Sequence, residues 1–237
     1  KVAGLTDGET PTDPVAWFRE RDRGDPNYST ILERLARTPA DRRNLLNRYF
    51  ERSADETDPS VKKPTRAHRA IAQLVSAGFI RVFLTTNFDR LLETAVREAG
   101  VEPVVISSPS AAAGATPLAH TRCTVVKLHG DYLAPDLKNT VDELGSYDPE
   151  IDRLLDRVFD EYGLVVCGWS GEWDEALRNA LLRAPGRRYG TYWARLGPLG
   201  ERAMQLVAHR QAVEVPIQGA DEFFEDLASK VSALDEG

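Results

Sequence analysis

Amide, carboxylate and imidazole side chains follow strand-like apolar segments of this chain. Asn87 and Asp89 come shortly after the segment 79–84. His129 follows a second such segment, 123–128. A carboxamide can orient a ligand or a water molecule, and an imidazole can exchange a proton near neutral pH. Because parallel strands bring their carboxyl ends to one edge of a sheet, where open α/β folds bind ligands, we expect these three side chains to converge on one site.

A third apolar segment, 163–168, ends in a glycine-bearing turn. Gly168, Trp169 and Ser170 lie between this segment and the helical pattern of 173–183. The free N–H groups and the positive dipole end of a helix start are suited to a diphosphate. Each motif taken alone also has a structural interpretation, as a helix cap, an interior imidazole or an aromatic side chain packed in the core. The combination of three such strand ends favours a binding site.

Six apolar segments of strand length alternate with amphipathic segments of helix length from residue 79 onward. This alternation predicts parallel βα units, and strands that are apolar throughout predict helices over both faces of the sheet. We therefore expect an α/β fold of the Rossmann-like, doubly wound kind, with a mostly parallel sheet of six or more strands. The expected strands are 79–84, 102–107, 123–128, 163–168, 189–194 and 212–217.

Amphipathic stripes predict the helices that flank these strands. They comprise Ile71, Leu74 and Val75; Ile151, Leu154, Leu155 and Val158; and Phe223, Phe224, Leu227 and Val231. Residues 1–63 differ, because prolines punctuate short charged helical pieces, and we expect a helical cap or insertion of the same domain there. Residues 64–237 then form the core. The stretch 107–121, rich in Ser, Ala, Pro and Gly, is expected to be a mobile loop beside the site.

The composition excludes several classes of protein. With 42% hydrophobic and 28% charged residues, the 237-residue chain can bury a core and is too mixed for a disordered or fibrous protein. A net charge of −7 and a pI near 5.2 argue against a general nucleic-acid surface. The sequence has no apolar stretch of about 18 residues and no secretory signal pattern. We therefore expect a cytoplasmic protein with a small-molecule partner and no membrane contact.

The three strand ends, in this order, resemble the sirtuin family, and more closely the sirtuin-like NAD hydrolases of bacterial anti-phage defence. Segment 85–89, Thr-Thr-Asn-Phe-Asp, is similar to the family's Thr-Gln-Asn-x-Asp motif, with Thr86 in place of Gln. Segment 127–131, Lys-Leu-His-Gly-Asp, resembles the catalytic His-Gly motif, and 168–170 resembles Gly-x-Ser. The resemblance extends over about residues 65–217.

This resemblance implies roles for residues of all three motifs. Asn87 would hold the nicotinamide ribose or the attacking water, and His129 would act as a base toward a ribose hydroxyl or that water. The implied NAD-binding residues are Thr85 and Thr86 at the ribose, Asp89 in the nicotinamide pocket, Gly168 and Ser170 on the phosphate or adenosine side, and Trp193 beside the adenine. Trp169, within the third motif, is a further candidate for NAD binding by stacking, with packing in the core as the alternative.

The family's glycine loop and zinc module are both missing from this sequence. Deacylating sirtuins carry two Cys pairs on zinc, whereas this chain has only Cys123 and Cys167, which we expect to be reduced core thiols. Neither a metal nor deacylation is therefore implied. The family's first strand ends in a Gly-Ala-Gly-x-Ser loop, and segment 3–5, Ala-Gly-Leu, is similar to the tail of that loop. We expect the first strand and its glycine loop to lie upstream of residue 1.

The resemblance implies an NAD glycohydrolase that gives nicotinamide and ADP-ribose, as the effector domain of a bacterial anti-phage defence protein. NAD is then the substrate, and breaking its nicotinamide–ribose bond releases a neutral leaving group that needs no acid. Two alternatives remain open, namely a silent sensor module that binds NAD or ADP-ribose, and an enzyme that transfers ADP-ribose or an acyl group. A sensor domain or partner protein of the same system, and a homo-oligomer, are both compatible with this interpretation.

Overall fold

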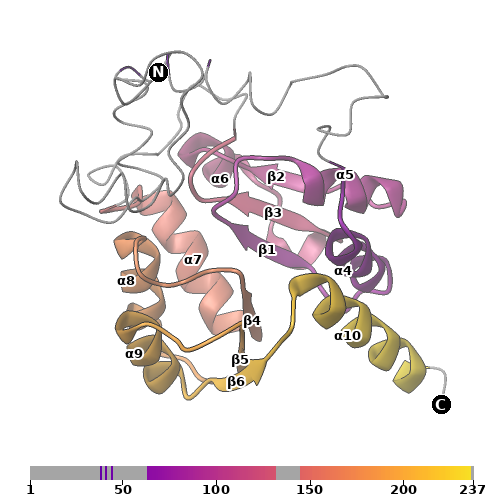
Figure 1. Cartoon of the computed structure of the whole chain (residues 1–237). Coiled ribbons are helices and arrows are strands. Elements are labelled where there is room, and N and C mark those ends of the chain that lie inside the picture. Colours follow the sequence, from indigo (N-terminus) through magenta and orange to yellow (C-terminus); the bar gives the residue numbers. More distant parts are fainter. Residues whose placement is uncertain (1–37, 39–40, 42–43, 45–62, 132–144, 236–237) are drawn as a thin grey trace, which may run out of the picture.

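The computed structural model describes residues 38, 41, 44, 63–131 and 145–235, and the expected helical cap 1–63 therefore lies almost entirely outside the described residues. Helices and strands alternate along the described chain (Figure 1). In chain order they are α4 (Arg66–Ser76), β1 (Val82–Thr85), α5 (Leu91–Glu98), β2 (Val104–Ile106), α6 (Pro109–Gly114), the 3-10 helix η1 (Leu118–His120), β3 (Thr124–Lys127), α7 (Pro149–Glu161), β4 (Leu164–Cys167), α8 (Glu175–Arg183), β5 (Thr191–Arg195), α9 (Glu201–Arg210), β6 (Val213–Pro216) and α10 (Ala220–Asp235).

All six expected strands are present, and every strand pair in the described part of the chain is parallel. The expectation of one sheet with six or more strands is wrong, however. Hydrogen bonds join the strands in two three-stranded sheets, ordered β1-β3-β2 and β4-β5-β6. The division falls between β1 and β4, which line opposite parts of one cavity instead of pairing. Strand pairing needs backbones about 4.8 Å apart, and the cavity between β1 and β4 shows that these two strands do not approach so closely.

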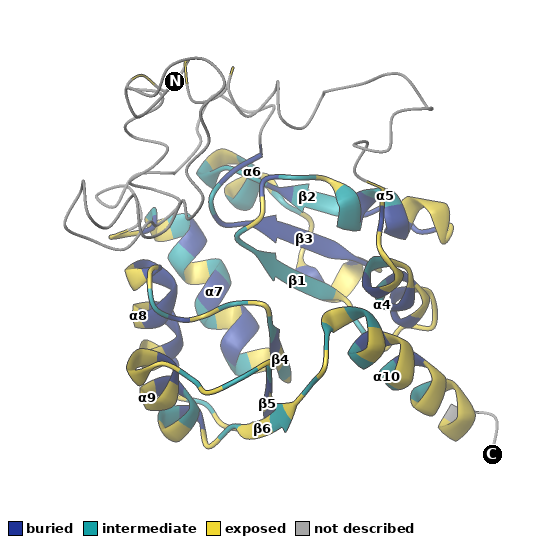
Figure 2. Cartoon of the chain, in the orientation of Figure 1, coloured by how far each residue is buried: buried dark blue, intermediate teal, exposed yellow. Residues whose placement is uncertain are grey.

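One apolar core joins the two sheets. Helices α6 and α7 pack on one face of the first sheet, and α7, α8 and α9 continue the same cluster over the second, where Leu155, Leu181 and Leu206 are almost fully buried. Helices α4 and α5 cover the other face of the first sheet. Helix α10 then returns to pack against α4 (Figure 1). Figure 2 shows β3 buried along its length at the centre of this arrangement.

Within the described residues, no helix covers one face of the second sheet, which corrects the expectation that helices cover both faces throughout. Val165, Tyr192 and Val213 stand side by side in the register of β4, β5 and β6. They are 44%, 48% and 55% exposed, respectively. An apolar row of this kind in a parallel sheet is normally covered by a helix. In the part of the chain that the structure describes, this face therefore lacks the covering layer that the first sheet has on both sides.

The stretch 107–121 is helical rather than a plain loop. Ser108 caps helix α6, because its side-chain oxygen accepts a hydrogen bond from the backbone N–H of Ala111 at 3.2 Å. Pro109 occupies the first turn, where its missing N–H costs nothing. The segment then forms η1 and places Leu118 in the core. A Ser-Pro cap followed by alanines is sufficient to start a short helix here.

Both cysteines are free thiols, as expected from their number. Burial and the nearby Glu93 carboxylate raise the pKa of Cys123 to about 12. Below that pH the thiol stays protonated and unreactive, because only the thiolate is nucleophilic. We therefore expect iodoacetamide at pH 8 to leave Cys123 unmodified in the folded protein and to alkylate it in denaturant, as mass spectrometry would measure. Modification of folded protein at the denatured rate would contradict this burial.

Candidate functional site

The carboxyl ends of β1 and β3 bring two of the predicted motifs together. Thr85 and Lys127 are register partners, and the N–H of Leu128 donates to the carbonyl of Thr85 at 2.9 Å. Asn87 and His129 each stand two residues beyond this pair. Neighbouring strands are about 4.8 Å apart, so the two residues leave the sheet side by side. The ring of His129 lies near that of Phe88, the residue after Asn87, with centroids 6.1 Å apart.

A cavity of about 200 Å³ separates the carboxyl end of β1 from β4. Five of the predicted site residues line it, namely Thr85, Thr86, Asn87, Gly168 and Trp169. Apolar side chains of β4, α7 and α8 form the rest of the wall. Asp89, His129, Ser170 and Trp193 lie outside the cavity wall. The structure therefore groups the first and third motifs around one cavity.

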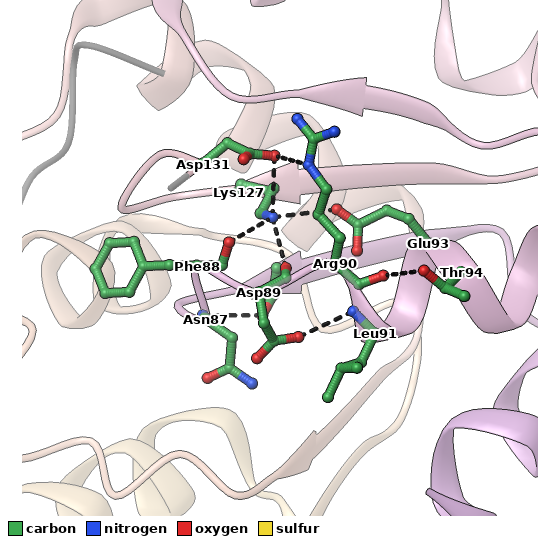
Figure 3. A network of polar contacts seen from close by, with 10 residues as sticks. Asn87, Phe88, Asp89, Arg90, Leu91, Glu93, Thr94, Lys127 and Asp131 are labelled. Atoms are coloured by element: carbon green, nitrogen blue, oxygen red, sulfur yellow. Dashed lines mark hydrogen bonds and ion pairs between the residues drawn. The ribbon is translucent and has the colours of Figure 1, made fainter. Parts of the chain in front are cut away.

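Asn87 is exposed, and its carboxamide is not committed to any hydrogen bond with the described residues. Its backbone N–H donates to Thr85 Oγ1 at 3.1 Å, which turns the chain sharply after β1. The carboxamide points away from the polar network behind this turn (Figure 3). A helix-capping role for Asn87 is therefore not observed, and its amide can serve a ligand.

A buried lysine holds the turn that carries Asn87. Lys127 is 0% exposed, and its Nζ donates to the carbonyls of Phe88 at 3.0 Å and Asp89 at 2.6 Å and to Asp131 Oδ2 at 3.2 Å (Figure 3). Glu93 Oε1 lies 3.2 Å from the same nitrogen. An ammonium has only three N–H groups, so the Glu93 oxygen is an ion-pair contact without a hydrogen bond of its own.

The charges of this network balance. The carboxylates of Glu93 and Asp131 are both 3% exposed, and Arg90 Nε adds a second cation 2.9 Å from Asp131 Oδ2. Two cations and two anions in one cluster avoid the cost of an unpaired buried charge. The cluster joins β3 to the start of α5 through backbone carbonyls. Lys127 therefore fixes where Asn87 lies without reaching a ligand itself.

Asp89 has the structural role that its position before a helix suggested. Its Oδ1 accepts a hydrogen bond from the N–H of Leu91 at 3.0 Å, at the first residue of α5. A carboxylate at this position also interacts favourably with the positive end of the helix dipole. Contact of Asp89 with nicotinamide stays a prediction, because this residue is outside the cavity wall.

His129 is held by an aspartate from another part of the chain. Its Nε2 lies 2.6 Å from Asp174 Oδ2, and the two side chains are 12% and 4% exposed. The Tyr147 hydroxyl donates to the same oxygen at 2.9 Å. The other oxygen of Asp174 caps α8 by accepting from the N–H of Leu177 at 2.8 Å. Three segments, the end of β3 and the starts of α7 and α8, therefore meet at this carboxylate.

The turn after β4 differs from the predicted diphosphate site. Gly168 and Gly171 have φ of +76° and +73°, which only glycine adopts freely. Ser170 Oγ accepts from the N–H of Glu172 at 3.3 Å within the turn. Helix α8 begins at Glu175, and Asp174 already satisfies its first turn. The Asp174 carboxylate disfavours an anion at this helix start, and contact of Gly168 and Ser170 with the phosphate or adenosine side of NAD stays a prediction.

Trp169 and Trp193 form a pair with ring centroids 5.7 Å apart and planes 30° from parallel. Trp193 is only 2% exposed and belongs to the core. Trp169 covers it and faces the cavity. The structure thus places Trp193 as support for Trp169, and a position of Trp193 beside adenine stays a prediction. Among the described residues, no group of three or more His, Cys, Asp or Glu side chains is arranged to hold a metal ion.

Three residues of this site had no role predicted from the sequence, namely Lys127, Tyr147 and Asp174. Lys127 gave the clearest signal, because it is the one charged residue in the apolar segment 123–128. A lysine inside a buried strand must find anionic or carbonyl partners. Asp174 caps α8 through one carboxylate oxygen, and its second oxygen contacts His129.

Parallel βα units with polar side chains at their carboxyl ends define an open-sheet α/β protein of the ligand-binding class. The model of the SIR2-like domain matches residues 81–208, which is more than half of the chain. The chain therefore belongs to the SIR2-like domain family, and this membership implies an NAD-related function. No curated protein matches the chain. Within the described residues, no helix has the length and apolar character needed to cross a membrane.

Proposed function

We propose that this protein is an NAD glycohydrolase, which cleaves the nicotinamide–ribose bond to give nicotinamide and ADP-ribose. The observation that carries this proposal is the pairing of an uncommitted carboxamide, Asn87, with an oriented imidazole, His129, at adjacent strand ends. The resemblance to anti-phage NAD hydrolases supports a role as a defence effector. With only two cysteines in the chain, deacylation that depends on a four-cysteine zinc module is disfavoured.

Each residue of the site has a separate role in the proposed reaction. The ribose gains oxocarbenium-like charge as the bond breaks, and oriented dipoles such as the Asn87 carboxamide stabilise it. His129 takes a proton from a ribose hydroxyl or from the attacking water. Nicotinamide leaves as a neutral group, so no side chain has to protonate it. Thr85, Thr86 and Trp169 would form the walls that hold the ribose and the nicotinamide.

The cavity alone is too small for the whole substrate. Its volume of about 200 Å³ is below the roughly 300–1,000 Å³ of typical small-molecule sites. It lies between β1 and β4, which are edge strands of their sheets among the described residues, and Val165 of the exposed apolar row is part of its wall. We propose that a further strand, followed by a helix, completes the sheet and the site, and that it comes from a segment upstream of residue 1 in a longer form of the chain.

Release of nicotinamide from NAD tests the function directly. The chain, and a longer form with about 40 more natural residues at its amino end, enough for one βα unit, are each incubated with NAD. Nicotinamide and ADP-ribose are measured by chromatography. We expect equal amounts of the two products, with faster turnover by the longer form. NAD binding without nicotinamide release in both forms would instead identify a sensor module, and nicotinamide without free ADP-ribose would identify a transferase.

A further inference from the structure

The Asp174 carboxylate can only accept hydrogen bonds, which determines what its neighbours must supply. Oδ1 accepts from the N–H of Leu177, and Oδ2 accepts from the Tyr147 hydroxyl. Burial and the Asp174 charge raise the pKa of Tyr147, so its hydroxyl stays protonated and remains a donor. The remaining contact, 2.6 Å from Oδ2 to His129 Nε2, therefore requires a proton on Nε2.

A proton on Nε2 leaves Nδ1 as the acceptor nitrogen of the neutral ring. Within the described residues, Nδ1 of His129 has no hydrogen-bond partner, whereas Nε2 is fully engaged. We propose that Asp174, supported by Tyr147, is a positioning residue that fixes the His129 ring in the Nε2–H tautomer and presents Nδ1 as the base. The expected effect on turnover rests on the proposed function. The tautomer of His129 rests only on the contacts of Asp174.

The change Asp174→Asn separates this role from helix capping. The amide oxygen of Asn can still accept from Leu177 and cap α8, because Asn and Asp cap about equally well. Its NH₂ group would face His129 and donate to Nε2, which drives the ring proton to Nδ1. The nitrogen that should accept a proton then carries one. Loss of the correct tautomer is a severe defect in sites where an aspartate orients a catalytic imidazole.

A second aspartate provides a matched control. Asp148 caps α7 by accepting from the N–H of Glu150 at 2.9 Å, and its side chain makes no contact with His129. Asp148→Asn is the same chemical change at another helix start. A third variant, Asp174→Ser, keeps a good capping residue but is too short to reach the imidazole. Melting temperatures establish that all three variants fold.

The experiment combines steady-state kinetics on NAD with ¹⁵N NMR of the histidine rings in mildly alkaline buffer, where His129 is assigned from its Gln variant. We expect the wild-type ring to be protonated at Nε2 and the Asp174→Asn ring at Nδ1. We expect kcat to fall at least about a hundredfold in both Asp174 variants, KM to change by less than about threefold, and Asp148→Asn to match the wild type.

Two results would overturn the inference: an unchanged tautomer in Asp174→Asn, or a kcat loss in the Asp174 variants no larger than in Asp148→Asn. If the kcat loss is no larger than in Asp148→Asn but the wild type still releases nicotinamide, only the inference about Asp174 fails and the proposed function stands. If the wild type releases none, the proposed function fails, and the ¹⁵N measurement alone decides the role of Asp174.

Discussion

Asn87→Ala is expected to lower NAD turnover at least about a hundredfold and to leave stability unchanged. The carboxamide is exposed and makes no hydrogen bond with the described residues, so its removal leaves no buried group unpaired. The backbone N–H that bonds to Thr85 is kept in the variant. Nicotinamide release and thermal melting would measure the two effects. Asn179, an exposed residue of α8, is the matched control, because Asn179→Ala should alter neither quantity by much.

His129 should show an equally large kinetic effect with a different cost in stability. His129→Ala removes the donor that lies 2.6 Å from a carboxylate only 4% exposed, so some destabilisation is expected. His129→Gln can still donate to Asp174 from its amide but cannot act as a base. We expect both variants to lose turnover at least about a hundredfold, with the Gln variant melting closer to the wild type. Turnover near the wild-type rate in either variant would exclude His129 as the base.

The order of elements was predictable because the strands are nearly continuous apolar runs. Their boundaries were less so, and the first strand shows why. The N–H of Phe79 donates to the carbonyl of Leu74 at 2.9 Å, and Gly78 turns the chain with φ of +84°. The apolar residues before Val82 therefore complete the end of α4 instead of joining β1. Hydrophobicity alone does not distinguish a helix end from a strand start.

The division into two sheets could not be predicted from the strands themselves. β1 and β4 have the apolar character of paired central strands, and pairing depends on what lies between their edges. The burial of β3 on both sides was predictable, and so was its position beside β1 once the motifs were taken as one site. Nothing in the apolar sequence of β4 indicates that Val165 remains 44% exposed.

Some residues of the candidate site were also predictable from the sequence, and others were not. Residues that belong to contiguous motifs, such as Asn87 and His129, were predictable because their strands place them at one sheet edge. Asp174 lies 45 residues from His129 in sequence, and only the packing of α8 brings the two together. One carboxylate oxygen of Asp174 caps α8 and the other contacts the His129 ring, so the same residue serves the helix and the imidazole.

Lys127→Met is expected to destabilise the fold by about 3 kcal/mol, near the lower end of the 3–5 kcal/mol found when one partner of a buried ion pair is removed. The substitution keeps the length of the side chain and leaves the buried Glu93 carboxylate without a cation. Asp131 keeps Arg90 at 2.9 Å, which limits the loss. The melting temperature should fall by roughly 6–12 °C for a chain of this size. Lys230→Met is the control, because Lys230 is 72% exposed and its pair with Asp226 is screened by water.

The double variant Lys127→Met/Glu93→Leu separates the two roles of Lys127. It removes the uncompensated carboxylate, so most of the lost stability should return if buried charge is the cause. The carbonyls of Phe88 and Asp89 still lack the donor that anchored them, at 3.0 and 2.6 Å. Turnover of NAD should therefore stay low in a protein that melts near the wild-type temperature, because Asn87 is no longer held in place. A double variant that recovers activity along with stability would show that Lys127 serves the fold alone and that the turn keeps its position without it.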